Sequence, residues 1–119
     1  MKGNIKEQTI YKHGHYSDII HSKSNFEEIV AKQEGLVVLD CYATWCGPCK
    51  VISPMVDQFS ETYSSANFYK MDVDQASELA QELGVRAMPT FMLFKGGERV
   101  KEVVGANPQA LRAAIESNL

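Results

Sequence analysis

Apolar residues recur along the chain with two different spacings. Residues 36–39 are all apolar, which is typical of a strand that is buried on both faces of a sheet. After residue 50 the apolar residues recur every three or four positions, which is typical of a helix with one buried face. Because segments of the two kinds alternate along the chain, the pattern predicts an α/β fold.

Four helices are expected from the apolar positions and from residues that begin helices. Ser24 and Glu27 form a capping-box pattern, in which Ser24 caps the first helix. Pro54 lies within the second helix and should kink it. Asn107 followed by Pro108 is typical of a capping residue and a first helical position, so the last helix should begin there.

Five strands are expected, at residues 19–20, 36–39, 67–73, 90–95 and 98–104. Gly96 and Gly97 separate the last two strands and are a hairpin signal. The first three strands are each followed by a helix, whereas the hairpin places two strands before the last helix. This order predicts a mixed sheet with helices on both of its faces.

Two thiols, Cys46 and Cys49, stand three positions apart at the expected start of the second helix. Side chains at this spacing are neighbours on a helix, with Cβ atoms about 5–6 Å apart. A disulfide needs a Cβ separation of roughly 3.5–4.5 Å, so a small adjustment closes the pair. Unpaired N–H groups at a helix start favour a thiolate. We therefore assign Cys46 as the nucleophile and Cys49, further into the helix and more shielded, as the resolving thiol.

The same CxxC spacing also occurs in zinc sites, which need about four ligands. The other candidate ligands are Cys41, inside an apolar run, and three upstream histidines, His13, His15 and His21. No second CxxC pair and no HxxxH pair is present. We therefore expect no metal site.

Composition narrows the possible function classes. The chain has 119 residues, 45% of them hydrophobic, so one domain with a buried core is expected. A net charge of −3 gives no electrostatic case for nucleic-acid binding, and no apolar stretch is long enough to span a membrane. No secretory signal is visible. Three cysteines suit a reducing compartment better than a disulfide scaffold.

Residues 1–17 are polar and lack a sustained periodicity. We expect them to form a flexible extension, with the folded domain at residues 18–119. A vector-derived leader and the remnant of a targeting segment are both compatible with this composition. The scarcity of Arg and Ser argues against a mitochondrial targeting segment.

Three segments resemble those of one protein family. The sequence of residues 42–50 is YATWCGPCK, which is similar to the active-site segment of thioredoxins. Residues 87–90, AMPT, resemble the family's loop with a cis proline, and residues 104–106, VGA, its third surface segment. The resemblance spans residues 18–119 and is strongest to eukaryotic thioredoxins of the cytosolic type. It implies a thioredoxin fold, with a central mixed five-stranded sheet flanked by four helices.

The resemblance also implies roles for individual residues. Asp40 matches the family's buried aspartate, the proposed proton acceptor for the resolving thiol, and Lys70 matches the lysine near it. From the residues alone, burial should raise the pKa of Asp40, although an ordinary carboxylate at a strand end is equally compatible. Pro89 matches the cis proline, beside which an extended substrate would pair with Met88 as an added strand. The substrate-binding residues expected are Trp45, Gly47, Pro48, Val73, Met88, Pro89, Val104, Gly105 and Ala106.

Two positions depart from the family's pattern. Many thioredoxins carry an aromatic residue where this chain has Cys41. Because side chains alternate along a strand, Cys41 should point away from Asp40 and form a small core thiol with no catalytic role. Ala87 replaces a glycine found in some relatives, which is a minor change.

These features predict a general protein-disulfide reductase, which cycles between the dithiol and the disulfide of Cys46 and Cys49. The resemblance implies a cytoplasmic monomer, with mitochondria as the alternative location. It also implies electrons from NADPH through thioredoxin reductase, with no cofactor bound to this chain. Implied clients are peroxiredoxins, methionine sulfoxide reductases and ribonucleotide reductase.

Two alternative functions stay open. A disulfide isomerase-like oxidoreductase usually has histidine where this chain has Pro48, and it enters the secretory pathway. A binding scaffold with the thioredoxin fold would not need the intact pair of Cys46 and Cys49.

Overall fold

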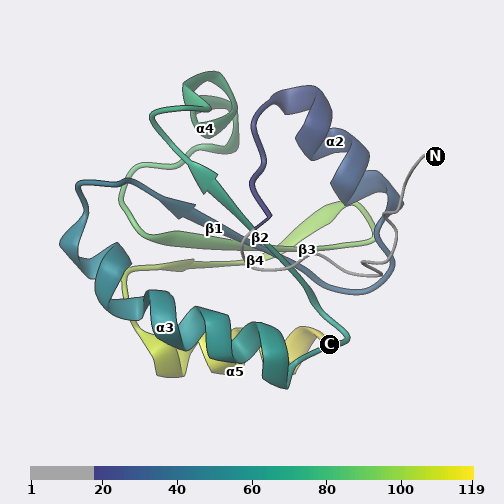
Figure 1. Cartoon of the computed structure of the whole chain (residues 1–119). Coiled ribbons are helices and arrows are strands. Elements are labelled where there is room, and N and C mark those ends of the chain that lie inside the picture. The colour runs from purple at the N-terminus through teal and green to yellow at the C-terminus, as the bar shows by residue number, and fades with distance from the viewer. Residues whose placement is uncertain (1–17) are drawn as a thin grey trace.

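The computed structural model describes residues 18–119, so the extension expected at residues 1–17, with His13 and His15, lies outside the described residues. The described residues contain the four expected helices, interleaved with strands (Figure 1). The elements are α2 Lys23–Lys32, β1 Val37–Tyr42, α3 Gly47–Thr62, β2 Asn67–Asp72, α4 Ser77–Leu83, β3 Thr90–Lys95, β4 Glu98–Val104 and α5 Pro108–Asn118.

The sheet is mixed, with the strand order β2-β1-β3-β4. β1 runs parallel to β2 and antiparallel to β3, and β3 and β4 form the antiparallel hairpin that the two glycines predicted. Gly96 and Gly97 both have positive φ angles, at 63° and 84°, which glycine adopts without strain. β1 therefore lies in the interior of the sheet, as its continuous apolar run predicted.

The prediction of five strands was wrong for the described residues, which contain four. Ile19 forms only an isolated parallel bridge with Lys70. The Lys70 N–H donates to the Asp18 carbonyl and the Ile20 N–H donates to the Lys70 carbonyl, at 3.0 and 2.9 Å. The next N–H, that of His21, donates to the Asn25 side chain instead. The chain thus leaves the sheet edge to begin α2.

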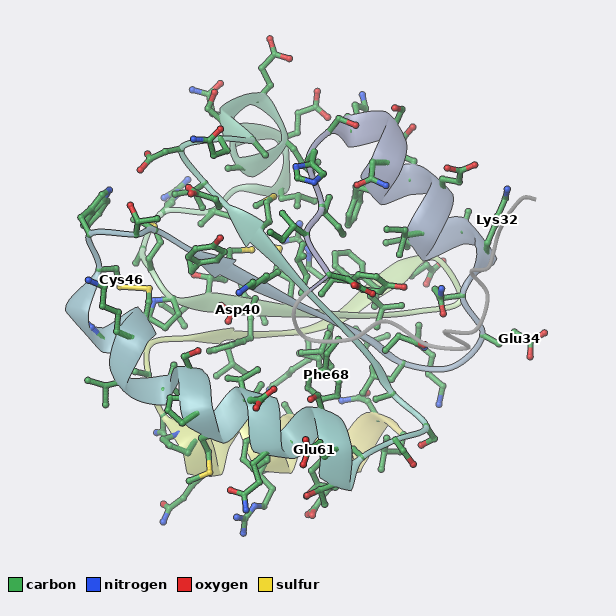
Figure 2. The ribbon with its side chains drawn as sticks, in the orientation of Figure 1. Lys32, Glu34, Asp40, Cys46, Glu61 and Phe68 are labelled. Atoms are coloured by element: carbon green, nitrogen blue, oxygen red, sulfur yellow. A yellow bond between two sulfur atoms is a disulfide. The ribbon has the colours of Figure 1, made fainter. Side chains whose placement is uncertain are left out.

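Helices cover both faces of the sheet, with α3 and α5 on one face and α2 and α4 on the other (Figure 1). Alternate residues of β1 divide between two apolar clusters: Val38 faces α3 and α5, whereas Leu39 faces α2 and α4. Phe68 of β2 packs in the α3–α5 cluster, while the charged Lys32 and Glu61 lie on the outside (Figure 2). No helix within residues 18–119 is long and apolar enough to span a bilayer.

Three of the four described helices, α2, α3 and α5, begin at a residue whose side chain accepts a capping hydrogen bond, and one of these caps corrects a prediction. α2 begins two residues earlier than predicted, because Ser22 and not Ser24 caps it. The Ser22 side chain accepts a hydrogen bond from the Asn25 N–H at 3.1 Å, so the cap is shifted along the chain. At α5 the prediction is confirmed: Asn107 is the cap and its side chain accepts from the Ala110 N–H at 3.1 Å.

Candidate active site

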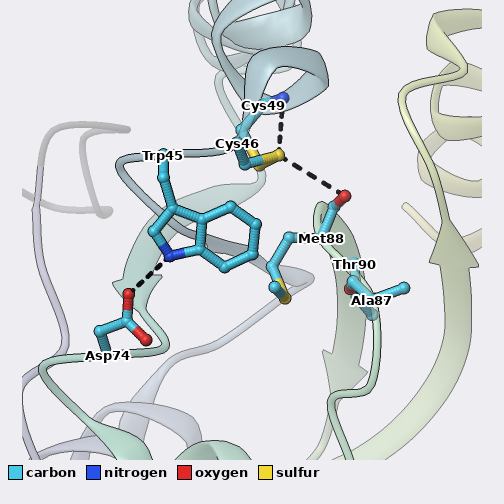
Figure 3. The surroundings of a disulfide bond; sticks show 7 residues. All are labelled: Trp45, Cys46, Cys49, Asp74, Ala87, Met88 and Thr90. Carbon is cyan, nitrogen blue, oxygen red and sulfur yellow. Dashed lines mark hydrogen bonds between the residues drawn. A yellow bond between two sulfur atoms is a disulfide. The ribbon is translucent and has the colours of Figure 1, made fainter.

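The two thiols lie where the β1–α3 loop turns into α3. Cys46 caps α3, and its Sγ accepts a hydrogen bond from the Cys49 N–H at 3.1 Å (Figure 3). The two residues form a disulfide with their Cα atoms 5.3 Å apart. Pro48 occupies the first turn, where it has no N–H to leave unpaired. The helix start thus holds both sulfurs and directs an N–H group at one of them.

Burial does not separate the two thiols as expected. Cys46 is 4% exposed and Cys49 is 7% exposed, so the greater shielding predicted for Cys49 is absent from this oxidised structure. The reason is that the disulfide draws both sulfurs into one small cluster with Ala43. Their asymmetry comes instead from position, because only Cys46 is the helix cap.

The loop before β3 also contacts the disulfide cluster. The Met88–Pro89 peptide is cis, as the resemblance implied. Cys46 Sγ lies 3.6 Å from the Met88 carbonyl oxygen, which can accept a hydrogen bond from the reduced thiol (Figure 3). The loop is held in place by the Thr90 hydroxyl, which donates to the Ala87 carbonyl at 2.6 Å. Sequence-distant Cys46 and Met88 are therefore adjacent.

The third segment joins the same surface. The Gly105 N–H donates to the Pro89 carbonyl at 2.8 Å, which ties residues 104–106 to the cis-proline loop. Gly105 has a φ angle of +101°, a backbone conformation that residues other than glycine rarely adopt. Val104 is 58% exposed although it is apolar. The structure therefore places residues 104–106 beside the cis-proline loop, which itself contacts Cys46.

Trp45 forms the other side of this surface and is 66% exposed. Its indole N–H donates to Asp74 Oδ2 at 2.9 Å (Figure 3). The Asp74 N–H in turn donates to the Asp72 carboxylate at 2.9 Å. Asp74 is not among the site residues expected from the sequence, and no local signal indicates it, because its partner lies 29 residues away. Val73, which was expected, packs half-buried against the disulfide cluster.

Asp40 and Lys70 occupy neighbouring strands behind the disulfide. They are register partners in the parallel β1–β2 pair, and Asp40 is 3% exposed. Asp40 lies in the interior of the domain, on the side of the sheet that faces α3 (Figure 2). A pocket of about 390 Å³ opens beside these two residues and reaches Cys49. The full lining is Asp40, Tyr42, Ala43, Thr44, Cys49, Lys50, Ser53 and Lys70.

The remaining residues singled out from the sequence are Gly47, beside the disulfide, and Cys41, on the other face of the sheet. Gly47 is exposed, and a Cβ added there would meet no atom beyond its chain neighbours within 4 Å. Cys41 is fully buried, and burial raises the pKa of its thiol. It packs in the α2–α4 cluster, on the opposite face of the sheet from Asp40. Within residues 18–119, no group of three or more His, Cys, Asp or Glu side chains is arranged to hold a metal ion.

Comparisons with known proteins give one consistent result. The family model described as Thioredoxin matches residues 17–117. Thioredoxin-1 of Schizosaccharomyces pombe is 57% identical over 100 residues, which cover 84% of this chain and 96% of that protein. Thioredoxin-1 of Saccharomyces cerevisiae is 56% identical over 95 residues, covering 80% of this chain and 91% of that protein.

Solved structures agree with this match. The oxidised mitochondrial thioredoxin 3 of Saccharomyces cerevisiae superposes with a TM-score of 0.82 at 37% identity, covering 85% of this chain and 94% of that one. Thioredoxin from Fasciola hepatica superposes with a TM-score of 0.83 at 36% identity, covering 86% and 99%. Thioredoxins use a redox-active disulfide and act with reductases and client proteins. The chain therefore belongs to the thioredoxin family, and it is a thiol–disulfide oxidoreductase with Cys46 and Cys49 as its redox-active pair.

Proposed function

We propose that Cys46 is the nucleophile of a general protein-disulfide reductase. The observation that carries this assignment is the 3.1 Å hydrogen bond from the Cys49 N–H to Cys46 Sγ at the start of α3. A negative charge on Cys46 is favoured there by the helix dipole as well as by this N–H. The Cys46 thiolate attacks a client disulfide, forms a mixed disulfide and releases one client thiolate.

Cys49 then completes the reaction. Its thiol gives a proton to the Asp40 carboxylate through the pocket that both residues line. The Cys49 sulfur bonds to Cys46 Sγ, the bond between Cys46 and the client breaks, and the client leaves as a thiolate. Lys70, beside Asp40 on the neighbouring strand, compensates the negative charge in this pocket. Two electrons thereby pass from the dithiol to the client disulfide.

The client binds across the exposed surface around the disulfide. An extended client segment pairs with the backbone of Met88 beside Pro89, and its side chains contact Trp45 and Val104. The exposure of the apolar Trp45 and Val104 side chains supports this role. Pairing through the backbone suits clients that differ in sequence, because every client has a main chain. The complete client surface consists of Trp45, Gly47, Pro48, Val73, Met88, Pro89, Val104, Gly105 and Ala106.

The electron donor and the clients follow from the family. NADPH reduces a flavin-containing thioredoxin reductase, which reduces the Cys46–Cys49 disulfide. Peroxiredoxins, methionine sulfoxide reductases and ribonucleotide reductase are the proposed clients. One similar solved structure, at 35% identity and a TM-score of 0.83, comes from work on the thiol-resolving mechanism of a yeast mitochondrial 1-Cys peroxiredoxin, which supports the first of these. The protein acts as a monomer in the cytoplasm, with mitochondria as the alternative location. Residues 18–119 form its thioredoxin domain, and residues 1–17 an extension that the activity does not need.

An insulin-reduction assay with dithiothreitol tests the proposed activity. The parent protein should accelerate the precipitation of insulin chains, and Cys46→Ser should abolish the acceleration. A parent protein that gives no acceleration would contradict the reductase. Binding of a client with equal affinity by the parent and by the Cys46→Ser variant, without any reduction, would instead favour a scaffold.

A further inference from the structure

The half-buried Tyr42 has no role in the mechanism above, yet it lines the pocket that Asp40 and Cys49 share. Tyr42 and Asp40 are two residues apart on β1, so their side chains leave the same face of the sheet. Lys70 leaves that face too, because it is the register partner of Asp40 in a parallel pair. Three neighbouring positions therefore direct a phenol, a carboxylate and an ammonium into one space.

A specific contact joins two of these groups. The Lys70 ammonium lies over the Tyr42 ring, 5.6 Å from its centroid, which is within the range of a cation–π interaction. Lys70 is only partly buried, at the edge of the described sheet, and its long side chain has several rotamers to choose from. Contact with the ring selects the rotamers that keep the ammonium beside the pocket.

We propose that Tyr42 is a positioning residue, whose ring holds the Lys70 ammonium at the pocket beside Cys49. This inference rests on the proposed roles of Asp40 and Cys49 in resolving the mixed disulfide. A cation held there favours the Cys49 thiolate, which is the form that attacks Cys46. Without the ring, the ammonium spends more time in solvent, and less of Cys49 reaches the reactive form.

The electrostatic surroundings of Tyr42 agree with its place in the pocket. Burial, together with the carboxylates of Asp72 and Asp40, raises the pKa of the Tyr42 phenol, so the ring faces Lys70 in its neutral form. Lys50 of α3 lines the same pocket and supplies a second positive charge. The titratable and charged groups that line this pocket are Asp40, Tyr42, Cys49, Lys50 and Lys70. Outside the lining, Asp72 is the register partner of Tyr42, and Cys46 belongs to the disulfide cluster against which Tyr42 packs.

A two-phase reaction with the aromatic disulfide DTNB isolates the resolving step. Attack by Cys46 on DTNB releases one thionitrobenzoate at a rate that depends on DTNB concentration. Attack by Cys49 on the resulting mixed disulfide releases a second one at a rate independent of that concentration. Stopped-flow absorbance therefore records both steps in the reduced full-length chain, and the first phase serves as an internal control for folding and for nucleophilic attack.

The variants are Tyr42→Leu, Lys70→Met, the double variant, and the matched control Tyr42→Phe. Tyr42→Leu should slow the second phase at pH 7 about three- to tenfold, the range expected for a partly desolvated cation–π contact, and should move its pH profile to higher pH. Lys70→Met should do at least as much, and the double variant should be no slower than Lys70→Met. Tyr42→Phe keeps the ring and should match the parent.

Several results would overturn the inference. A second phase of parental rate in Tyr42→Leu, while Lys70→Met is slow, would show that the ring does not act through Lys70. A double variant whose second phase is slowed by the product of the two single-variant factors would show the same. If Tyr42→Leu fails to fold, Tyr42→Val, which suits a strand, replaces it. Parental second phases in both Lys70→Met and Asp40→Asn would instead remove the proposed roles of those residues, on which the inference rests.

Discussion

Cys41 should make the stability of the fold depend on pH in a way that its burial determines. The side chain is fully buried, so its thiol stays protonated in the folded chain. In the unfolded chain it ionises near its ordinary pKa of 9.0. A thiol whose folded pKa is raised contributes stability that is complete below the unfolded pKa and is lost as the pH rises toward the folded pKa.

The size of this loss follows from the unfolded pKa alone. Between pH 7 and pH 10.5 the unfolded thiol passes 1.5 units above its pKa of 9.0. At about 1.36 kcal/mol per unit, the parent should lose about 2 kcal/mol that a chain without this thiol does not lose. Cys41→Ala should be about 1 kcal/mol less stable than the parent at pH 7, because it leaves a small cavity, and more stable than the parent at pH 10.5.

Urea denaturation at the two pH values measures the effect. Both chains should carry Cys46→Ser and Cys49→Ser, since an unfolded Cys41 thiolate would otherwise exchange with the disulfide. All other titrating groups are common to the two chains and cancel in the difference. A stability difference that stays constant from pH 7 to pH 10.5 would refute the reasoning, because it would mean that Cys41 ionises equally in the folded state. In the otherwise unchanged chain, Cys41→Ala should reduce insulin at the parental rate.

Three further changes test other parts of the account. Asp40→Asn should slow the second DTNB phase without slowing the first. It should also raise the free energy of unfolding at pH 7 by roughly 1–3 kcal/mol, because burying an amide costs less hydration free energy than burying a carboxylate. An unfolding free energy equal to the parent's would argue against a desolvated Asp40. Asp74→Ala removes the acceptor of the Trp45 N–H and should lower kcat/KM for insulin about two- to fivefold, with the DTNB rates unchanged; equal losses for insulin and DTNB would mean that Asp74 does not act through the client surface. Deletion of residues 1–17 should change the free energy of unfolding by less than about 1 kcal/mol and leave insulin reduction unchanged; a larger loss would show that the segment docks on the domain.

The chain's own pattern identified most of the elements correctly, since each depends on nearby residues. The apolar run at residues 36–39 predicted the interior strand β1, and the paired glycines predicted the β3–β4 hairpin. The pattern at residues 19–20 was misleading, because two apolar residues are too few to show whether a chain stays in a sheet. Ser22 and Ser24 are both able to cap a helix, and the choice between them depends on the path by which the chain leaves Lys70.

Site features that are local in the sequence could likewise be predicted, whereas those that depend on the tertiary fold could not. The cysteine pair could be identified from its spacing and its place at a helix start, which are local properties. The meeting of Cys46 with Met88 depends on the order β2-β1-β3-β4, which places the start of β3 beside the end of β1. That order became predictable only through the family resemblance. The hydrogen bond between Trp45 and Asp74 joins side chains of two loops, and neither residue spacing nor apolar periodicity predicts it.

Trapping of the mixed disulfide tests the central claim, which is that Cys46 attacks and Cys49 resolves. Each single-cysteine variant, Cys49→Ser and Cys46→Ser, is incubated with an oxidised client, and the products are separated on a non-reducing gel and mapped by mass spectrometry. The account predicts a stable client adduct through Cys46 in the Cys49→Ser variant and little or none in the Cys46→Ser variant. An adduct that accumulates through Cys49 in the Cys46→Ser variant, with none in Cys49→Ser, would reverse the two roles and contradict the account.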